Sequence, residues 1–156
     1  MPKKAPPPGA VPSSPSLVWG GLPKGSRVFV DTAPFIYVLE DHPEFADRFI
    51  GLFEAAAQAR IDILVSAITI AEVLTGPASA GLAALGKRYE KALCQYEVVP
   101  VTAPVASLAA LLRLRYRLRL PDAMQLACAL EAGAHALVTH DRNFRAVKDL
   151  PVLTGD

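Results

Sequence analysis

Residues 118–144, LRLPDAMQLACALEAGAHALVTHDRNF, are the stretch from which the fold can be worked out. After Pro121, apolar residues recur at helical spacing as far as Gly133, so we expect a helix that ends at this glycine. Residues 136–139 are short, apolar and β-prone, which predicts a buried strand. The stretch therefore indicates a helix, a turn and a buried strand, the unit from which α/β folds are built.

Two acids in this stretch, Asp122 and Asp141, lie at the ends of predicted elements. Asp122 follows Pro121 in the first turn of the helix, where the positive end of the helix dipole favours an ionised carboxylate. Asp141 comes just past the carboxyl end of the strand. In open α/β sheets this edge is where ligands bind, so both acids are candidates for a site.

The rest of the chain alternates strands and helices in the same way. Expected strands cover residues 27–30, 61–65, 97–101, 136–139 and 152–153. Expected helices cover 35–40, 44–59, 68–76, 79–94, 104–117 and 121–132, with a short helix running from Asp141 toward Val147. This order predicts parallel strands joined by right-handed crossovers, in a three-layer α/β/α sandwich around a mainly parallel sheet of four to five strands.

Residues 113–119 are ambiguous, because arginines alternate there with apolar residues at the period of a strand. The preceding helix has no break before Tyr116. We therefore expect helix to about Arg117 and extended chain from there to Leu120.

Length and composition indicate one globular domain. The chain has 156 residues, 52% of them hydrophobic, enough for a single core. Residues 1–26 are rich in Pro, Gly and Ser and predict a flexible tail, leaving a domain of residues 27–156. From Arg27 onward there are 13 basic and 15 acidic residues. Any bound polyanion would have to be held by a local basic patch or by metal ions.

The cysteines and the hydropathy bear on where the protein works. Cys94 and Cys128 lack metal-type spacing and fall in predicted helices, so we expect buried, reduced thiols and a cytoplasmic protein. No apolar run approaches membrane-spanning length, so we expect no membrane association.

Two further acids complete a candidate cluster. Asp31 ends the first strand, with Thr32 able to cap the next helix, and Glu72 lies about two turns into the helix that leaves the second strand. Carboxylates about 4 Å apart repel by roughly 4 kcal/mol at an effective dielectric near 20. Either a cation shares such a site or some of the acids are protonated. Oxygen ligands favour Mg²⁺ or Mn²⁺. Such ions point to phosphodiester hydrolysis.

The sequence resembles the PIN domain family, and within it the VapC-type toxin ribonucleases of VapBC toxin–antitoxin pairs. The matching residues are VFVDT at 28–32, Ser66 with TIAEVL at 69–74, LPDA at 120–123 with Leu126-Ala127, and LVTHD at 137–141 with Phe144. Many members carry a second acid just before the phenylalanine, where this chain has Asn143.

The resemblance implies a metal-dependent endoribonuclease whose acidic cluster is Asp31, Glu72, Asp122 and Asp141, with Thr139 as a neighbouring hydroxyl. It also implies a cognate antitoxin, an RNA substrate and a homodimer. The residues that could hold RNA phosphates are Arg113, Arg115, Arg117 and Arg119, with Lys87, Arg88 and Lys91, although solvated helix faces explain these charges as well.

Other interpretations of the same residues stay open. Taken singly, Asp31 could merely end a strand, Asp122 could serve the helix dipole, and Asp141 could cap the short helix. Glu72 taken alone is a solvated helix residue. The domain could be a catalytically silent module that binds RNA or a protein.

Two other catalytic arrangements are disfavoured. An aspartyl-phosphate mechanism at Asp31 lacks a second acid, because Ala33 stands in its place. A triad of Ser66, His140 and Asp141 would need adjacent residues to point the same way from extended chain.

Overall fold

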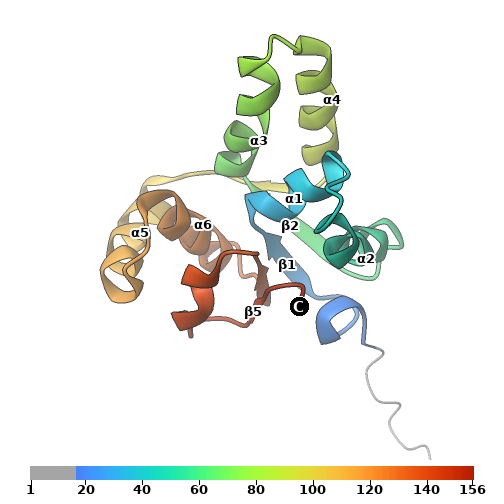
Figure 1. The fold of residues 1–156 in the computed structure, drawn as a ribbon. Coiled ribbons are helices and arrows are strands. Elements are labelled where there is room, and N and C mark those ends of the chain that lie inside the picture. Colours follow the sequence, from blue (N-terminus) through green and yellow to red (C-terminus); the bar gives the residue numbers. More distant parts are fainter. Residues whose placement is uncertain (1–16) are drawn as a thin grey trace, which may run out of the picture.

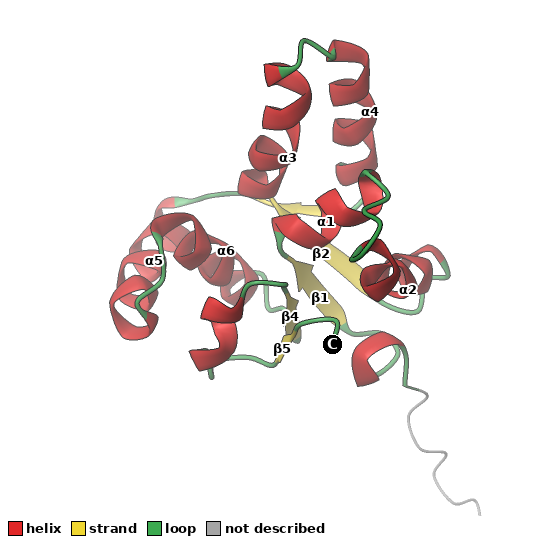
Figure 2. Cartoon of the chain, in the orientation of Figure 1, coloured by secondary structure: helices red, strands yellow, loops and turns green. Residues whose placement is uncertain are grey.

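The computed structural model describes residues 17–156, which form a five-stranded, fully parallel sheet with helices on both faces (Figures 1 and 2). The strand order is β3-β2-β1-β4-β5. The strands are β1 (Arg27–Val30), β2 (Asp62–Ser66), β3 (Glu97–Val99), β4 (Ala136–Val138) and β5 (Val152–Leu153). The predicted three-layer α/β/α architecture is confirmed.

The helices follow the predicted order, with some shifted ends. They are α1 (Thr32–Leu39), α2 (Ala46–Ala57), α3 (Ala67–Ser79), α4 (Ala83–Leu93), α5 (Ala103–Tyr116) and α6 (Leu120–Glu131), with short 3₁₀ turns η1 (Trp19–Gly21) and η2 (Arg142–Ala146). As predicted, α5 continues to Tyr116, and Arg117 ends it with a φ of 56°.

The alternation of side chains along the strands divides the core into two layers. Phe29 of β1 packs with α5 and α6, whereas its neighbours Val28 and Val30 pack with α1 to α4. Each strand residue thus faces the opposite layer from the next, as a pleated strand requires. Figure 1 shows α5 and α6 on one side of the sheet and α1 and α2 on the other, with α3 and α4 projecting as a pair.

Three predictions about particular residues were wrong. Helix α3 was expected to end at Gly76-Pro77 but runs on to Ser79, because Pro77 is buried and lies in the last turn, where loss of its N–H costs one hydrogen bond. The next helix begins at Ala83, four residues late. Cys94 was expected to be buried but is exposed, since it caps the end of α4. Cys128 is buried, and neither thiol forms a disulfide within the described residues.

Residues 17–26 belong to the segment predicted as a flexible tail, yet they pack against the domain. The Trp19 indole lies 6.1 Å from the Phe49 ring and donates a hydrogen bond to the Arg48 carbonyl, and Leu22 is buried. The predicted tail at residues 1–16 lies outside the described residues.

Candidate active site at the carboxyl edge of the sheet

Asp31 stands at the centre of the candidate site. It follows β1 directly and caps the amino end of α1, with its Oδ1 accepting the Thr32 N–H at 2.8 Å. Its Oδ2 accepts the Thr139 hydroxyl at 2.8 Å, from the end of β4. The side chain is buried, with the residue 8% exposed. A carboxylate in this position is fixed in orientation by groups from two neighbouring strands.

The electrostatic environment of Asp31 opposes its ionisation. The pKa of its carboxyl group is raised to about 6, chiefly by burial and to a smaller extent by the charges of Asp122 and Glu72, against hydrogen bonds from Thr139 and Thr32 that lower it. The structure therefore brings these three acids close enough to repel one another. A cation bound among them would favour the ionised form.

A buried side-chain amide donates a hydrogen bond to Asp31 from the core. Gln125 of α6 is 1% exposed, and its Nε2 donates to Asp31 Oδ1 at 3.2 Å, to Thr32 Oγ1 at 3.2 Å and to Thr69 Oγ1 at 2.8 Å. Its Oε1 accepts the hydroxyl of Ser66. These hydrogen bonds connect the ends of β1 and β2 to α6 next to the acids. Sequence reasoning missed it, although one signal was present: Gln125 is the polar residue between Met124 and Leu126 on an apolar helix.

Glu72 and Asp122 reach the site from two helices. Glu72 of α3 accepts a hydrogen bond from the Thr32 hydroxyl on Oε2. Because Thr32 directly follows Asp31 in the chain, this bond brings the Glu72 carboxylate close to Asp31. Asp122 lies in the first turn of α6, as predicted, and its Oδ2 accepts from Arg119 Nε at 3.1 Å. The predicted helix position of Asp122 is confirmed, and the assignment of Glu72 and Asp122 to a catalytic site stays a prediction.

Arg119 is a cation already placed among the acids. The hydrogen bond to Asp122 and its charge raise the pKa of the Arg119 guanidinium most, and the charges of Asp141 and Glu72 raise it further. One guanidinium thus lies within the field of three candidate acids. Its side chain is 77% exposed, so it is free to move away.

Asp141 joins the cluster at its margin. Its backbone N–H donates to Thr139 Oγ1 at 3.0 Å, so the same hydroxyl links it to Asp31. The carboxylate caps η2: Oδ1 accepts the Asn143 N–H at 2.8 Å, and Oδ2 lies 3.4 Å from Asn143 Nδ2. Asn143, the residue that departs from the family pattern, therefore engages both oxygens of Asp141.

The arginines predicted to hold RNA do not act as one group. Arg113, Arg115 and Arg117 are exposed on or after α5, and Arg115 pairs with Asp149 at 3.3 Å. Of the four, Arg119 is the one that contacts a candidate site residue. RNA binding by the other three stays a prediction.

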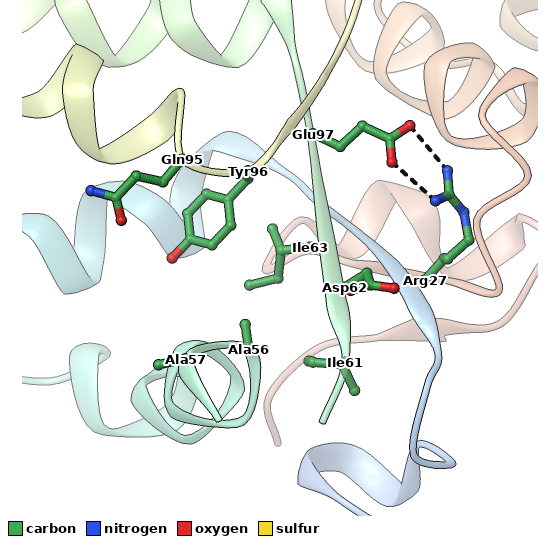
Figure 3. Close-up of a pocket in the computed structure, with 9 residues that line it drawn as sticks. All are labelled: Arg27, Ala56, Ala57, Ile61, Asp62, Ile63, Gln95, Tyr96 and Glu97. Carbon is green, nitrogen blue, oxygen red and sulfur yellow. Dashed lines mark hydrogen bonds and ion pairs between the residues drawn. The ribbon is translucent and has the colours of Figure 1, made fainter. Parts of the chain in front are cut away.

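A cavity of about 540 Å³ lies at the opposite, amino edge of the sheet, where Arg27 and Glu97 form a two-pronged ion pair (Figure 3). Its lining also includes Asp62, Gln95 and Tyr96, but no candidate acid. The chemistry expected from the sequence therefore does not belong to this cavity.

Comparison with known proteins places the chain in a family. The model of the PIN domain family matches residues 28–150. Because this match spans most of the chain, the protein belongs to the PIN domain family. A search of curated protein sequences found no match.

Solved structures share the fold at low sequence identity. A toxin–antitoxin complex from Klebsiella pneumoniae superposes with a TM-score of 0.68 at 24% identity, covering 83% of this chain and 98% of that one. For VapBC2 from Rickettsia felis, bound to a promoter DNA fragment, the TM-score is 0.67 at 20% identity, with 81% and 97% covered. VapC20 from Mycobacterium tuberculosis, described as a toxin that cleaves the sarcin–ricin loop, gives 0.57 at 19% identity, with 76% and 93% covered. The chain therefore has the fold of VapBC toxins.

Proposed function

We propose that this chain is a Mg²⁺- or Mn²⁺-dependent endoribonuclease and the toxin of a toxin–antitoxin pair, with its activity in residues 27–156. The observation that carries the proposal is the approach of Asp31, Glu72 and Asp122 at the carboxyl edge of the sheet, around a carboxyl group whose pKa rises to about 6. A buried acid among like charges is costly to fold. A site that binds a divalent cation accounts for that cost.

The donor chemistry of the cluster fits such an ion. Within residues 17–156, no three His, Cys, Asp or Glu side chains form a ready-made metal cluster, so the fit rests on the donors themselves. Carboxylate oxygens are the ligands that Mg²⁺ and Mn²⁺ prefer. We assign Asp31, Asp122 and Glu72 to the metal, with Asp141 at the margin. The bound ion would supply an activated water and neutralise charge on the phosphate oxygens.

The residues of the chain would divide the remaining tasks. Thr139 and Gln125 hold both oxygens of Asp31 in place, so the carboxylate need not reorganise when substrate arrives. Glu72 has one oxygen engaged by Thr32. Its other oxygen would be the one that reaches the metal.

The partners follow from the same proposal. Similar folds occur in toxin–antitoxin complexes, which supports a cognate antitoxin as the inhibitor of this chain. We also propose an RNA substrate, a homodimer and a cytoplasmic location. None of the helices in residues 17–156 has the length and apolar character needed to span a bilayer.

A catalytically silent binding module is the second candidate, favoured by Asn143, which occupies the oxygens of Asp141.

Cleavage of a labelled RNA by the purified chain, with and without Mn²⁺, tests the proposal. The wild type should cleave with Mn²⁺ and stop in excess chelator. Asp122→Asn should lower the rate by roughly 10²–10³-fold, as removal of one electrostatic stabiliser does. Asp62→Asn, at the opposite edge of the sheet, makes the same chemical change and should leave the rate unaltered. Cleavage that persists in chelator or in Asp122→Asn contradicts the mechanism, and absence of cleavage by a Mn²⁺-binding wild type favours the silent module.

A further inference from the structure

A second cavity, of about 490 Å³, opens directly beside the acidic cluster and shares Asp141 with it. This volume lies within the range of small-molecule sites, roughly 300–1,000 Å³. The lining includes Arg48, Arg142 and Arg145 on the cationic side and Phe45 and His140 on the aromatic side. The cavity is therefore a candidate for a ligand that carries both negative charge and a flat ring.

The acid of the cluster itself positions two of these arginines. Asp141 caps η2, the short turn that carries Arg142 and Arg145. Both arginines are exposed, and within residues 17–156 neither makes an ion pair. The cap therefore presents two uncommitted guanidinium groups within one turn of a candidate catalytic acid. Planar guanidinium groups bind phosphate oxygens in a two-pronged manner.

The facing wall is aromatic and held in place. The Phe45 and His140 rings lie 4.6 Å apart, and His140 Nδ1 is 2.9 Å from the Tyr37 hydroxyl. Arg48 lies over Phe45 at 5.3 Å and pairs with Asp156 at 2.8 Å, which neutralises both charges. The other two acids in the lining are Glu44 and Asp141. Asp141 belongs to the acidic cluster and caps η2, so Glu44 is the acid that faces Arg142 and Arg145 from outside the cluster.

We propose that this cavity, which we call the η2 pocket, binds the segment of single-stranded RNA next to the cleaved phosphate. Arg142 and Arg145 contact its backbone, and a base lies against Phe45 and His140. The inference rests on the proposed ribonuclease function and names a substrate site for it. A pocket of this volume admits an unstacked nucleotide but not a double helix, and single strands are bound by cationic grooves with aromatic walls.

Equilibrium binding separates this inference from the catalytic proposal. The anisotropy of a fluorescein-labelled single-stranded RNA is measured with the full chain in chelator, over a series of salt concentrations. The test variant is the double change Arg142→Gln/Arg145→Gln. The matched comparison is Lys87→Gln/Arg88→Gln, which removes the same charge from α4 and also tests the basic residues there that the sequence offered for RNA. Arg113→Gln/Arg117→Gln tests the arginines at the end of α5.

The η2 double variant should raise the Kd by roughly 10-fold and reduce the slope of log K against log salt by about 1.4, or about 0.7 for each RNA phosphate that the variant no longer neutralises. The α4 control should bind as the wild type does. The charge-preserving variant Arg142→Lys/Arg145→Lys should keep the salt slope, which excludes misfolding as the cause.

Other outcomes overturn the inference. Wild-type affinity in the η2 variant, or an equal loss of affinity in the α4 control, removes it. A weakening confined to the α5 pair moves RNA binding to that helix. If the η2 variant binds RNA normally but no longer binds a fluorescent poly-glutamate peptide, the pocket takes an acidic protein segment. A wild type that binds RNA through the η2 pocket but never cleaves it refutes the catalytic proposal alone.

Discussion

The two edges of the same sheet treat charge in opposite ways. At the amino edge, Arg27 and Glu97 pair through two hydrogen bonds of 3.0 and 3.1 Å, and both side chains are partly exposed. At the carboxyl edge, Asp31 is buried beside two other acids and its pKa rises to about 6. Charges at the first edge neutralise one another in water, whereas those at the second repel. At the second edge the acids outnumber Arg119 and one of them is buried, so that arrangement would gain from an added cation.

The direction of the chain explains why the acids gather at one edge. In a parallel sheet all strands end at the same edge, where the following helices begin. Helices α1 and α3 follow β1 and β2 there, and α6 brings its first turn to the same place. Helix amino ends favour negative charge, which partly offsets the repulsion among carboxylates.

The largest expected effect comes from the amide that supports the carboxyl edge. Gln125→Met should remove four hydrogen bonds and leave buried hydroxyl groups without partners, lowering the free energy of unfolding by about 2–5 kcal/mol. Gln95→Met at the amino edge is exposed and should change it by less than about 0.5 kcal/mol. Urea unfolding measures both. Equal effects of the two changes would erase the proposed difference between the edges.

The pH dependence of stability should come next in size. Because the folded pKa of Asp31 is about 6 against an ordinary 3.8, the folded state holds the proton more tightly. The Asp31 contribution to the free energy of unfolding is fully present below about pH 4, where both states are protonated. It should fall by roughly 2–3 kcal/mol as pH rises from there through 6, at about 1.36 kcal/mol per pKa unit.

Urea unfolding in chelator at pH 4 and pH 7.5 checks this sign. Asp31→Asn cannot ionise, so relative to the wild type it should gain stability at the higher pH. Asp62→Asn removes an exposed carboxylate at the amino edge and should follow the wild type at both values. A stability difference between wild type and Asp31→Asn that is independent of pH would show that burial of Asp31 carries no such cost.

The smallest expected effect concerns the cation already at the site. Arg119 and a divalent ion would compete for Asp122, so Arg119→Gln should tighten Mn²⁺ binding by about two- to five-fold, the value of an exposed ion pair. Arg27→Gln removes the same charge at the amino edge and should leave Mn²⁺ affinity unchanged. The Mn²⁺ affinity of both variants is determined by measuring free Mn²⁺ with electron paramagnetic resonance. Weaker Mn²⁺ binding in Arg119→Gln would make the arginine a support of the site and not a competitor.

The sequence patterns predicted which helices and strands occur better than they predicted where each one begins and ends. The unbroken apolar spacing before Tyr116 outweighed the alternating arginines, and α5 is helical there. Pro77 was expected to end α3, yet its side chain is buried and the helix continues, because packing outweighs the loss of one hydrogen bond. Trp19 and Leu22 were assigned to a tail by composition, which carries no information on a partner 29 residues away.

The candidate site also has parts that local sequence predicted and parts that only the tertiary structure decided. Residue type and local spacing were enough to place Asp31, Asp122 and Asp141 at the ends of elements, because capping and strand endings are local properties of the chain. Tertiary structure decided that Gln125 lies beneath Asp31, that Arg119 pairs with Asp122, and that a pocket opens beside Asp141. The hydrogen bond between Gln125 and Asp31 joins residues 94 positions apart, and it exists only once the sheet has brought its strands together.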